Sequence, residues 1–145
     1  MVLLIVLVFI LISTFGATSI VEMHQTQTQR EKEEQLLFVG AQYRRAINSY
    51  YNTRPPRGDR SAPLTLNDLL DDNRYPTAAH HLRRLYVDPM TGRADWVLVM
   101  GAGGIVGVHS ASKLPTIKKQ GFSGANKSLE NKASYDEWVF TITPQ

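Results

Sequence analysis

The chain opens with a run of 21 residues, MVLLIVLVFILISTFGATSIV, that contains no charged side chain. Leu, Ile, Val and Phe dominate it. A helix rises 1.5 Å per residue, so this run would be roughly 30 Å long as a helix, which matches the hydrocarbon thickness of a bilayer. Residues 1–21 are therefore predicted to form a transmembrane helix, and this prediction constrains everything that follows in the chain.

A cleaved secretory signal is the main alternative for this run. Three details oppose it: no Lys or Arg precedes the apolar residues, the run is longer than the apolar part of an ordinary signal, and no Ala-x-Ala cleavage site follows. We expect residues 1–21 to be retained as an anchor. Their orientation is not set by charge, because Arg30 and Lys32 are accompanied by Glu22, Glu31, Glu33 and Glu34.

The apolar run is expected to continue as one long helix, half in lipid and half in water, because no proline follows until Pro55. Residues 22–52 would be its amphipathic half. Apolar side chains recur there at spacings of three and four, which predicts a buried stripe. Its members are Leu36, Val39, Tyr43, Ala46 or Ile47, and Tyr50. Gly40 lies inside this segment and suggests a close packing contact.

Proline and glycine end the helix in NTRPPRGDRSAP, residues 52–63. The Arg-Gly-Asp triplet at residues 57–59 is too short to indicate adhesion. A two-turn helix is predicted over residues 64–72, with Thr65 as its N-cap and Asp68 completing a capping box. A short helical turn is also expected at residues 80–85.

The hydrophobic period changes to two after the turn Asp88-Pro89-Met90-Thr91-Gly92. Strands are predicted at residues 94–100 and 105–109, joined by a hairpin turn at Gly101-Ala102-Gly103-Gly104, and a third at residues 137–143. Residues 111–135 contain too much Pro and Gly to predict regular structure. Three antiparallel strands would cover the helix stripe, so the predicted fold class is α+β, with a long N-terminal helix packed on a small antiparallel sheet.

Composition excludes several functions. The chain has no cysteine, which rules out disulfides, thiol catalysis and Cys-based zinc sites. The formal charge of +3 is a mild excess. Lys113, Lys118 and Lys119, with Phe122 nearby, are the best candidates for a nucleic-acid contact, but basic and aromatic residues are too few there to make nucleic acid an expected partner.

Candidate catalytic and metal-binding residues are sparse. His80 and His81 are adjacent, so on a helix they would point about 100° apart and not chelate one metal; we interpret them as a surface pair. Two carboxylate pairs, Asp71 with Asp72 and Asp88 with Asp95, lack the spacing of a calcium loop. Asp88 is better explained as a turn-capping residue. We expect no enzyme activity, metal or cofactor.

Four segments together resemble the type IV pilin and type II secretion pseudopilin family, in particular its pseudopilin-like bacterial subgroup. They are REKEEQLLFVGAQYRRAINSYY (residues 30–51), LYVDPMTGRADWVLV (85–99), GGIVGVHSAS (103–112) and YDEWVF (135–140). Their order and spacing carry the resemblance, which spans most of the chain. The residues that mark it in the globular part are Asp88, Pro89, Gly92, Trp96, Gly104 and Trp138.

The resemblance implies a structural subunit of a secretion or pilus filament. Such proteins lie in the bacterial inner membrane with a periplasmic C-terminal domain, here residues 53–145, and an assembly platform extracts them into a polymer. The expected partners are other pilin-like subunits, the platform and the lipid bilayer. Apolar helices leave lipid only if they bury against one another. The residues expected to pack are Leu4, Leu7, Leu11, Leu36, Tyr43, Ile47 and Tyr50.

The family also has a Gly-Phe processing site and a glutamate early in the apolar run, whereas the first acid here is Glu22. We expect a short basic leader with a Gly-Phe junction to be encoded just upstream of Met1, which the upstream codons would reveal. Two alternatives remain: a divergent member, or a single-pass membrane protein whose domain binds a partner without polymerising. A minor pilin that contacts DNA is a further possibility. Calcium ligands cannot be carried over onto residues 123–137.

Overall fold

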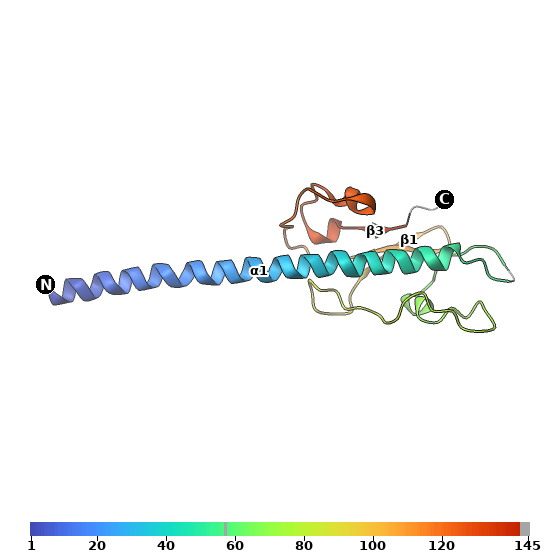
Figure 1. Cartoon of the computed structure of the whole chain (residues 1–145), viewed down its shortest axis with the longest axis horizontal. Helices are drawn as coiled ribbons and strands as arrows, with labels where there is room; N and C mark the ends of the chain where they lie inside the picture. Colours follow the sequence, from blue (N-terminus) through green and yellow to red (C-terminus); the bar gives the residue numbers. More distant parts are fainter. Residues whose placement is uncertain (57, 143–145) are drawn as a thin grey trace.

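One long helix organises the molecule. The computed structural model describes residues 1–56 and 58–142, without the side chains of residues 12–23. Helix α1 runs from Val2–Asn52, 51 residues, and is therefore about 77 Å long. Figure 1 shows that its N-terminal half projects away from the rest of the chain, while its C-terminal half lies along a small domain.

Helix α1 ends where the sequence predicts, just before the tandem prolines. The Thr53 amide donates a hydrogen bond to the Ser49 carbonyl at 3.0 Å, and the Thr53 hydroxyl donates to the same oxygen at 2.7 Å. Thr53 itself has extended backbone angles. Pro55 and Pro56 have no amide hydrogen to continue the helix, so the chain leaves the helix axis at this point.

A three-stranded antiparallel sheet covers the C-terminal half of the helix. Strand β1 (Val97–Gly101) pairs with β2 (Gly104–His109), and β2 pairs with the short β3 (Phe140–Thr141), in the order β1-β2-β3. Gly101 faces Gly104 across the hairpin, as predicted for the glycine-rich turn. Gly104 has φ +144°, and a Cβ there would lie 2.6 Å from the Pro63 carbonyl oxygen, so only glycine fits.

The core lies between α1 and this sheet. Gly40 of α1 faces the ring of Phe140 on β3, and a Cβ at residue 40 would lie only 2.5 Å from that ring. The expectation of a close contact at Gly40 is thus confirmed. The buried helix stripe joins the strand and loop residues in one cluster, whose largest fully buried members are Trp138, Tyr43, Tyr135, Phe140, Leu36 and Ile47.

The predicted helices after α1 are wrong in extent. Residues 64–72 form one 3-10 turn, η1 (Leu66–Leu69), rather than two α-turns, although its capping box between Thr65 and Asp68 is present. The turn stops because the Leu69 carbonyl accepts hydrogen bonds from the amides of His81 and Leu82 instead of continuing a helix. Those same long-range bonds hold residues 80–85 in an irregular path, so the helical turn predicted there is absent.

The C-terminal third also differs from prediction. A 3-10 helix, η2 (Gly124–Leu129), forms in the segment expected to lack regular structure. The strand predicted at residues 137–143 is reduced to β3, and η3 (Tyr135–Glu137) precedes it; residue 143 lies outside the described residues. The predicted alternation nevertheless holds, because Trp138, Phe140 and Ile142 are buried. The architecture is α+β: a long helix on a small antiparallel sheet.

Candidate interaction surface

The most prominent surface is the projecting end of α1. Every large apolar side chain from Met1 to Leu11 is exposed, and Leu4, Leu7 and Leu11 are 70%, 57% and 52% accessible. These three, which the sequence suggested as packing residues, are thus left more than half exposed. Leu36, Tyr43, Ile47 and Tyr50 lie in the core instead. Large apolar side chains left exposed along a helix mark a surface that meets lipid or protein.

Among the residues whose side chains the structure describes, no helical stretch is both long and apolar enough to span a bilayer.

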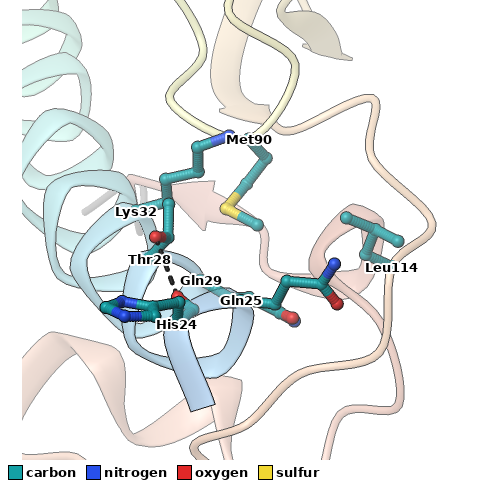
Figure 2. Close-up of a pocket in the computed structure, with 7 residues that line it drawn as sticks. All are labelled: His24, Gln25, Thr28, Gln29, Lys32, Met90 and Leu114. Carbon is teal, nitrogen blue, oxygen red and sulfur yellow. Dashed lines mark hydrogen bonds between the residues drawn. The ribbon is translucent and has the colours of Figure 1, made fainter. Parts of the chain in front are cut away.

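The second feature is a cavity of about 300 Å³ where α1 enters the domain. Figure 2 shows its lining: one face of the helix, contributed by His24, Gln25, Thr28, Gln29 and Lys32, lies opposite Met90 and Leu114 from two loops. We call the part of the domain around this cavity, formed by the loops that carry Met90 and Leu114, the near end. Lys32 and His24 are the basic residues in the lining, and none of the lining residues that the structure describes is acidic.

Hydrogen bonds to α1 fix the loop that carries Leu114. The Gln29 side-chain amide donates to the Pro115 carbonyl at 2.9 Å and to the Tyr135 hydroxyl at 3.1 Å. One turn further on, the buried Glu33 carboxylate accepts a hydrogen bond from the Lys118 amide at 2.9 Å. The loop is therefore held at two successive turns of the helix, and its position along α1 is well defined.

Asp88 fixes the loop that carries Met90. Its fully buried carboxylate accepts hydrogen bonds from the Met90 amide at 2.9 Å and from the Ser110 hydroxyl at 2.6 Å. The Gly92 amide closes the turn by donating to the Asp88 carbonyl at 2.7 Å, and Gly92 has φ +71°. Asp88 is thus a turn-capping residue, as predicted, and it does not pair with Asp95.

Other sequence-marked residues serve the same part of the fold. The Trp96 indole donates to the Tyr86 carbonyl at 2.9 Å, and Trp96 packs edge-on against Tyr43 with ring centroids 5.2 Å apart. Pro89 lines a groove beside α1. Trp138 stacks edge-on between Phe122 and Tyr135. Asp88, Trp96, Gly104 and Trp138 therefore position loops and strands around the helix.

The structure brings together one polar cluster that the sequence reading missed. Arg74 donates to both carboxylate oxygens of Asp72, at 2.8 and 2.7 Å, and His81 Nε2 lies 3.1 Å from Asp72 Oδ2. On its other side His81 Nδ1 lies 2.8 Å from the Ser49 hydroxyl. The prediction of a surface histidine pair is wrong for His81, whose side chain is 5% exposed, while that of His80 is 66% exposed.

Electrostatics favour a structural role for this cluster. Burial alone would raise the pKa of the Asp72 carboxyl, but hydrogen bonds from Arg74 and His81 outweigh it and lower the pKa to about 2. Arg74 also donates to the Tyr50 carbonyl at 2.8 Å, near the end of α1. Although Ser49, His81 and Asp72 are linked in series, Arg74 already neutralises Asp72, which weakens the support that a catalytic imidazolium needs. We interpret the cluster as a clamp on the helix end.

The remaining candidates do not form a site. The glycine-rich turn is a hairpin connection. Asp71 does not share the role of Asp72, because it is exposed and pairs with the exposed His80, at 3.4 Å. Within the described residues, no group of three or more His, Asp or Glu side chains is placed to hold a metal ion. Arg57, which begins the Arg-Gly-Asp triplet, lies outside the described residues.

The three loop lysines differ in their surroundings. Lys118 lies over the Phe122 ring at 4.8 Å, and the Lys119 ammonium donates to the Thr116 hydroxyl at 2.7 Å and the Lys132 carbonyl at 3.0 Å. Lys113 is exposed and has no such contact with another described residue. The sequence analysis treated these three lysines as one basic loop. It did not single out Leu114, which is exposed and lies directly beside the exposed Lys113.

Comparisons of this chain with known protein families, with curated proteins and with solved structures found no match. The interpretation of the surface therefore rests on the sequence segments quoted above and on the geometry of the molecule.

Proposed function

We propose that this protein is a pseudopilin-like structural subunit of a type II secretion or type IV pilus assembly system. Residues 1–21 anchor it in the bacterial inner membrane with the globular domain in the periplasm. The same helix segment then provides the surface through which subunits polymerise. The observation that carries the proposal is the continuity of α1, which passes without a break from exposed apolar side chains into a stripe packed on its own sheet.

The exposed apolar surface of α1 must be covered by lipid or by protein. Burying a Leu, Val or Phe side chain is worth about 1.5 to 3 kcal/mol, so the exposed residues from Met1 to Leu11 need a lipid or protein environment. In the membrane, lipid supplies it. In a filament, equivalent helices of neighbouring subunits supply it. The hydrophobic core of the domain is built on the other half of α1, so neighbouring helices can pack against residues 1–11 without disturbing it.

Disulfide crosslinking tests the proposal, because the chain has no native cysteine. Leu4 and Val6 lie about 160° apart around the helix, since each residue advances 100°. The double variant L4C/V6C, oxidised in membranes of cells that carry the assembly machinery, is expected to give a ladder of dimers, trimers and larger products.

Two controls make the result specific. L4C alone can form only dimers, and L64C places an equally exposed thiol on the loop after α1, where Leu64 is 72% accessible. Monomers only, or one fixed complex with another protein from L4C/V6C, would argue instead for the non-polymerising membrane protein that the sequence leaves as the alternative.

A further inference from the structure

We propose that the near end of the domain rests on the membrane surface, with Leu114 in the headgroup layer of an anionic phospholipid bilayer and Lys113 against lipid phosphates. This inference rests on the proposed anchoring of residues 1–21, and it adds a second, independent contact with lipid. The domain would then be held close to the bilayer rather than at the end of a free helical stalk.

The position of Leu114 along α1 places it near the membrane surface. The hydrocarbon core of a bilayer is about 30 Å thick, and each headgroup layer adds roughly 5 to 8 Å. With residue 21 at the hydrocarbon boundary, Gln25 lies about 6 Å beyond it, because four residues rise about 6 Å. The cavity that Leu114 lines begins on α1 at His24 and Gln25 (Figure 2), so this end of the cavity lies at headgroup depth.

Leu114 is exposed on a loop that is held in place. Its side chain is 52% accessible, although the loop around it is firmly attached to the helix through Gln29 and Glu33. Figure 1 shows that this end of the domain faces the projecting half of α1. A large apolar side chain held rigidly on that face, with the apolar Met90 across the cavity, fits the interface between headgroups and acyl chains.

Charge identifies the lipid class. Lys113 is exposed and directly precedes Leu114. Of the described acids near this loop, Glu33 does not oppose Lys113, because its carboxylate is buried against the Lys118 amide. Exposed lysines at this depth attract anionic headgroups, and each strengthens binding by roughly fivefold.

Fluorescence quenching in vesicles tests the inference on the full chain. Three single-cysteine variants, V8C, L114C and L64C, carry the same environment-sensitive label and are reconstituted into vesicles of phosphatidylglycerol and phosphatidylcholine. Quenchers attached to lipid headgroups or acyl chains report depth. Leu64 is the matched control, because it lines a cavity with Tyr50, about 38 Å further along α1 than Gln25.

The expected result is strong acyl-chain quenching at residue 8, headgroup quenching at residue 114 and none at residue 64. Quenching at residue 8 but not at residue 114 would overturn the membrane contact and leave the anchor intact. No quenching at either position would overturn the anchor as well. If residue 114 were shielded from a water-borne quencher without lipid quenching, a protein would cover it, and the inference would be wrong.

A charge variant tests the lipid class. K113Q, made in the labelled L114C chain, is expected to reduce the ratio of lipid-contacting to free near ends by about fivefold. Replacing part of the phosphatidylglycerol with phosphatidylcholine should also reduce this ratio. K127Q is the matched control, because Lys127 is exposed on η2, which lies beside Arg44 and far from the near end. Equal losses from K113Q and K127Q, or none from K113Q, would contradict a specific contact with anionic headgroups.

Discussion

At the scale of single residues, the molecule depends on polar side chains that are buried and fully paired. Asp72 has no exposed side-chain surface, yet its charge is balanced by Arg74 and its second oxygen faces His81. Arg74 also lies over the Tyr50 ring at 3.6 Å and donates to the Tyr50 carbonyl. One carboxylate therefore holds the loop after η1 against the end of α1, and its loss leaves two basic groups without their partner.

The variant D72N tests this clamp. Removing one partner of a buried ion pair typically costs about 3 to 5 kcal/mol, and we expect a loss of that order in the free energy of unfolding at pH 7, measured with denaturant in detergent micelles. D71N is the control, because the Asp71 carboxyl is exposed and is expected to change stability by less than about 0.5 kcal/mol.

The same carboxyl gives a pH dependence with a definite sign. Its pKa falls from 3.8 to about 2 on folding, so its stabilisation is complete above pH 4 and is lost as the pH falls toward 2. The wild-type chain should lose about 2 kcal/mol more stability across that interval than D72N. Parallel pH profiles of the two proteins would contradict the assignment.

At the scale of elements, the contact between α1 and β3 sets how closely helix and sheet approach. Gly40 lets the Phe140 ring lie directly against the helix backbone, and the ring fills the space that a side chain would need. Glycine lowers helix propensity by about 1 kcal/mol relative to alanine, so it is retained here at an intrinsic cost. Packing between the two elements, rather than local preference, explains this residue.

The variant G40A is therefore expected to destabilise the protein although it improves helix propensity. A methyl group 2.5 Å from the ring forces the ring or the strand to move, at a cost of about 1 to 3 kcal/mol. Thermal unfolding followed by circular dichroism measures it. The double variant G40A/F140L provides space for the methyl group, and a G40A loss that F140L does not reduce would show that the contact is not the cause.

At the scale of the whole molecule, α1 serves two environments. Its C-terminal half is part of the domain core, and its N-terminal half has exposed apolar side chains that the domain does not cover. In the proposed function, the N-terminal half is held in the membrane or filament, and α1 acts as a rigid rod that sets the position of the domain relative to it. The near end would add a second contact at the level where the two halves meet.

The variant L11K tests the anchoring half. Residue 11 is the centre of the apolar run, where a lysine costs about 2.5 to 3.5 kcal/mol of apparent insertion free energy. We expect a reduced fraction of the protein to remain in membranes after alkaline carbonate extraction. Q27K, a lysine on the exposed polar part of α1, should leave that fraction unchanged. Complete retention of L11K would argue against residues 1–21 as a membrane span.

The sequence by itself determined the elements whose signals are local. The long helix, its end before the prolines, the capping box at Thr65, the glycine hairpin and the Asp88 turn all follow from periodicity or from backbone chemistry within a few residues. The alternation of Trp138, Phe140 and Ile142 likewise predicted which side chains are buried. Each of these features depends on neighbours in the chain.

Only the tertiary structure decided the features whose partners are distant in sequence. The Leu69 carbonyl accepts hydrogen bonds from the amides of His81 and Leu82, and η1 stops there. His81 is buried because its two ring nitrogens lie within hydrogen-bond distance of Ser49 and Asp72. Gln29 and Glu33 place the loop of Leu114 beside the start of the domain across more than 80 residues. Hydrogen bonds of this kind outweigh weak local propensities, and no periodic pattern in the sequence records them.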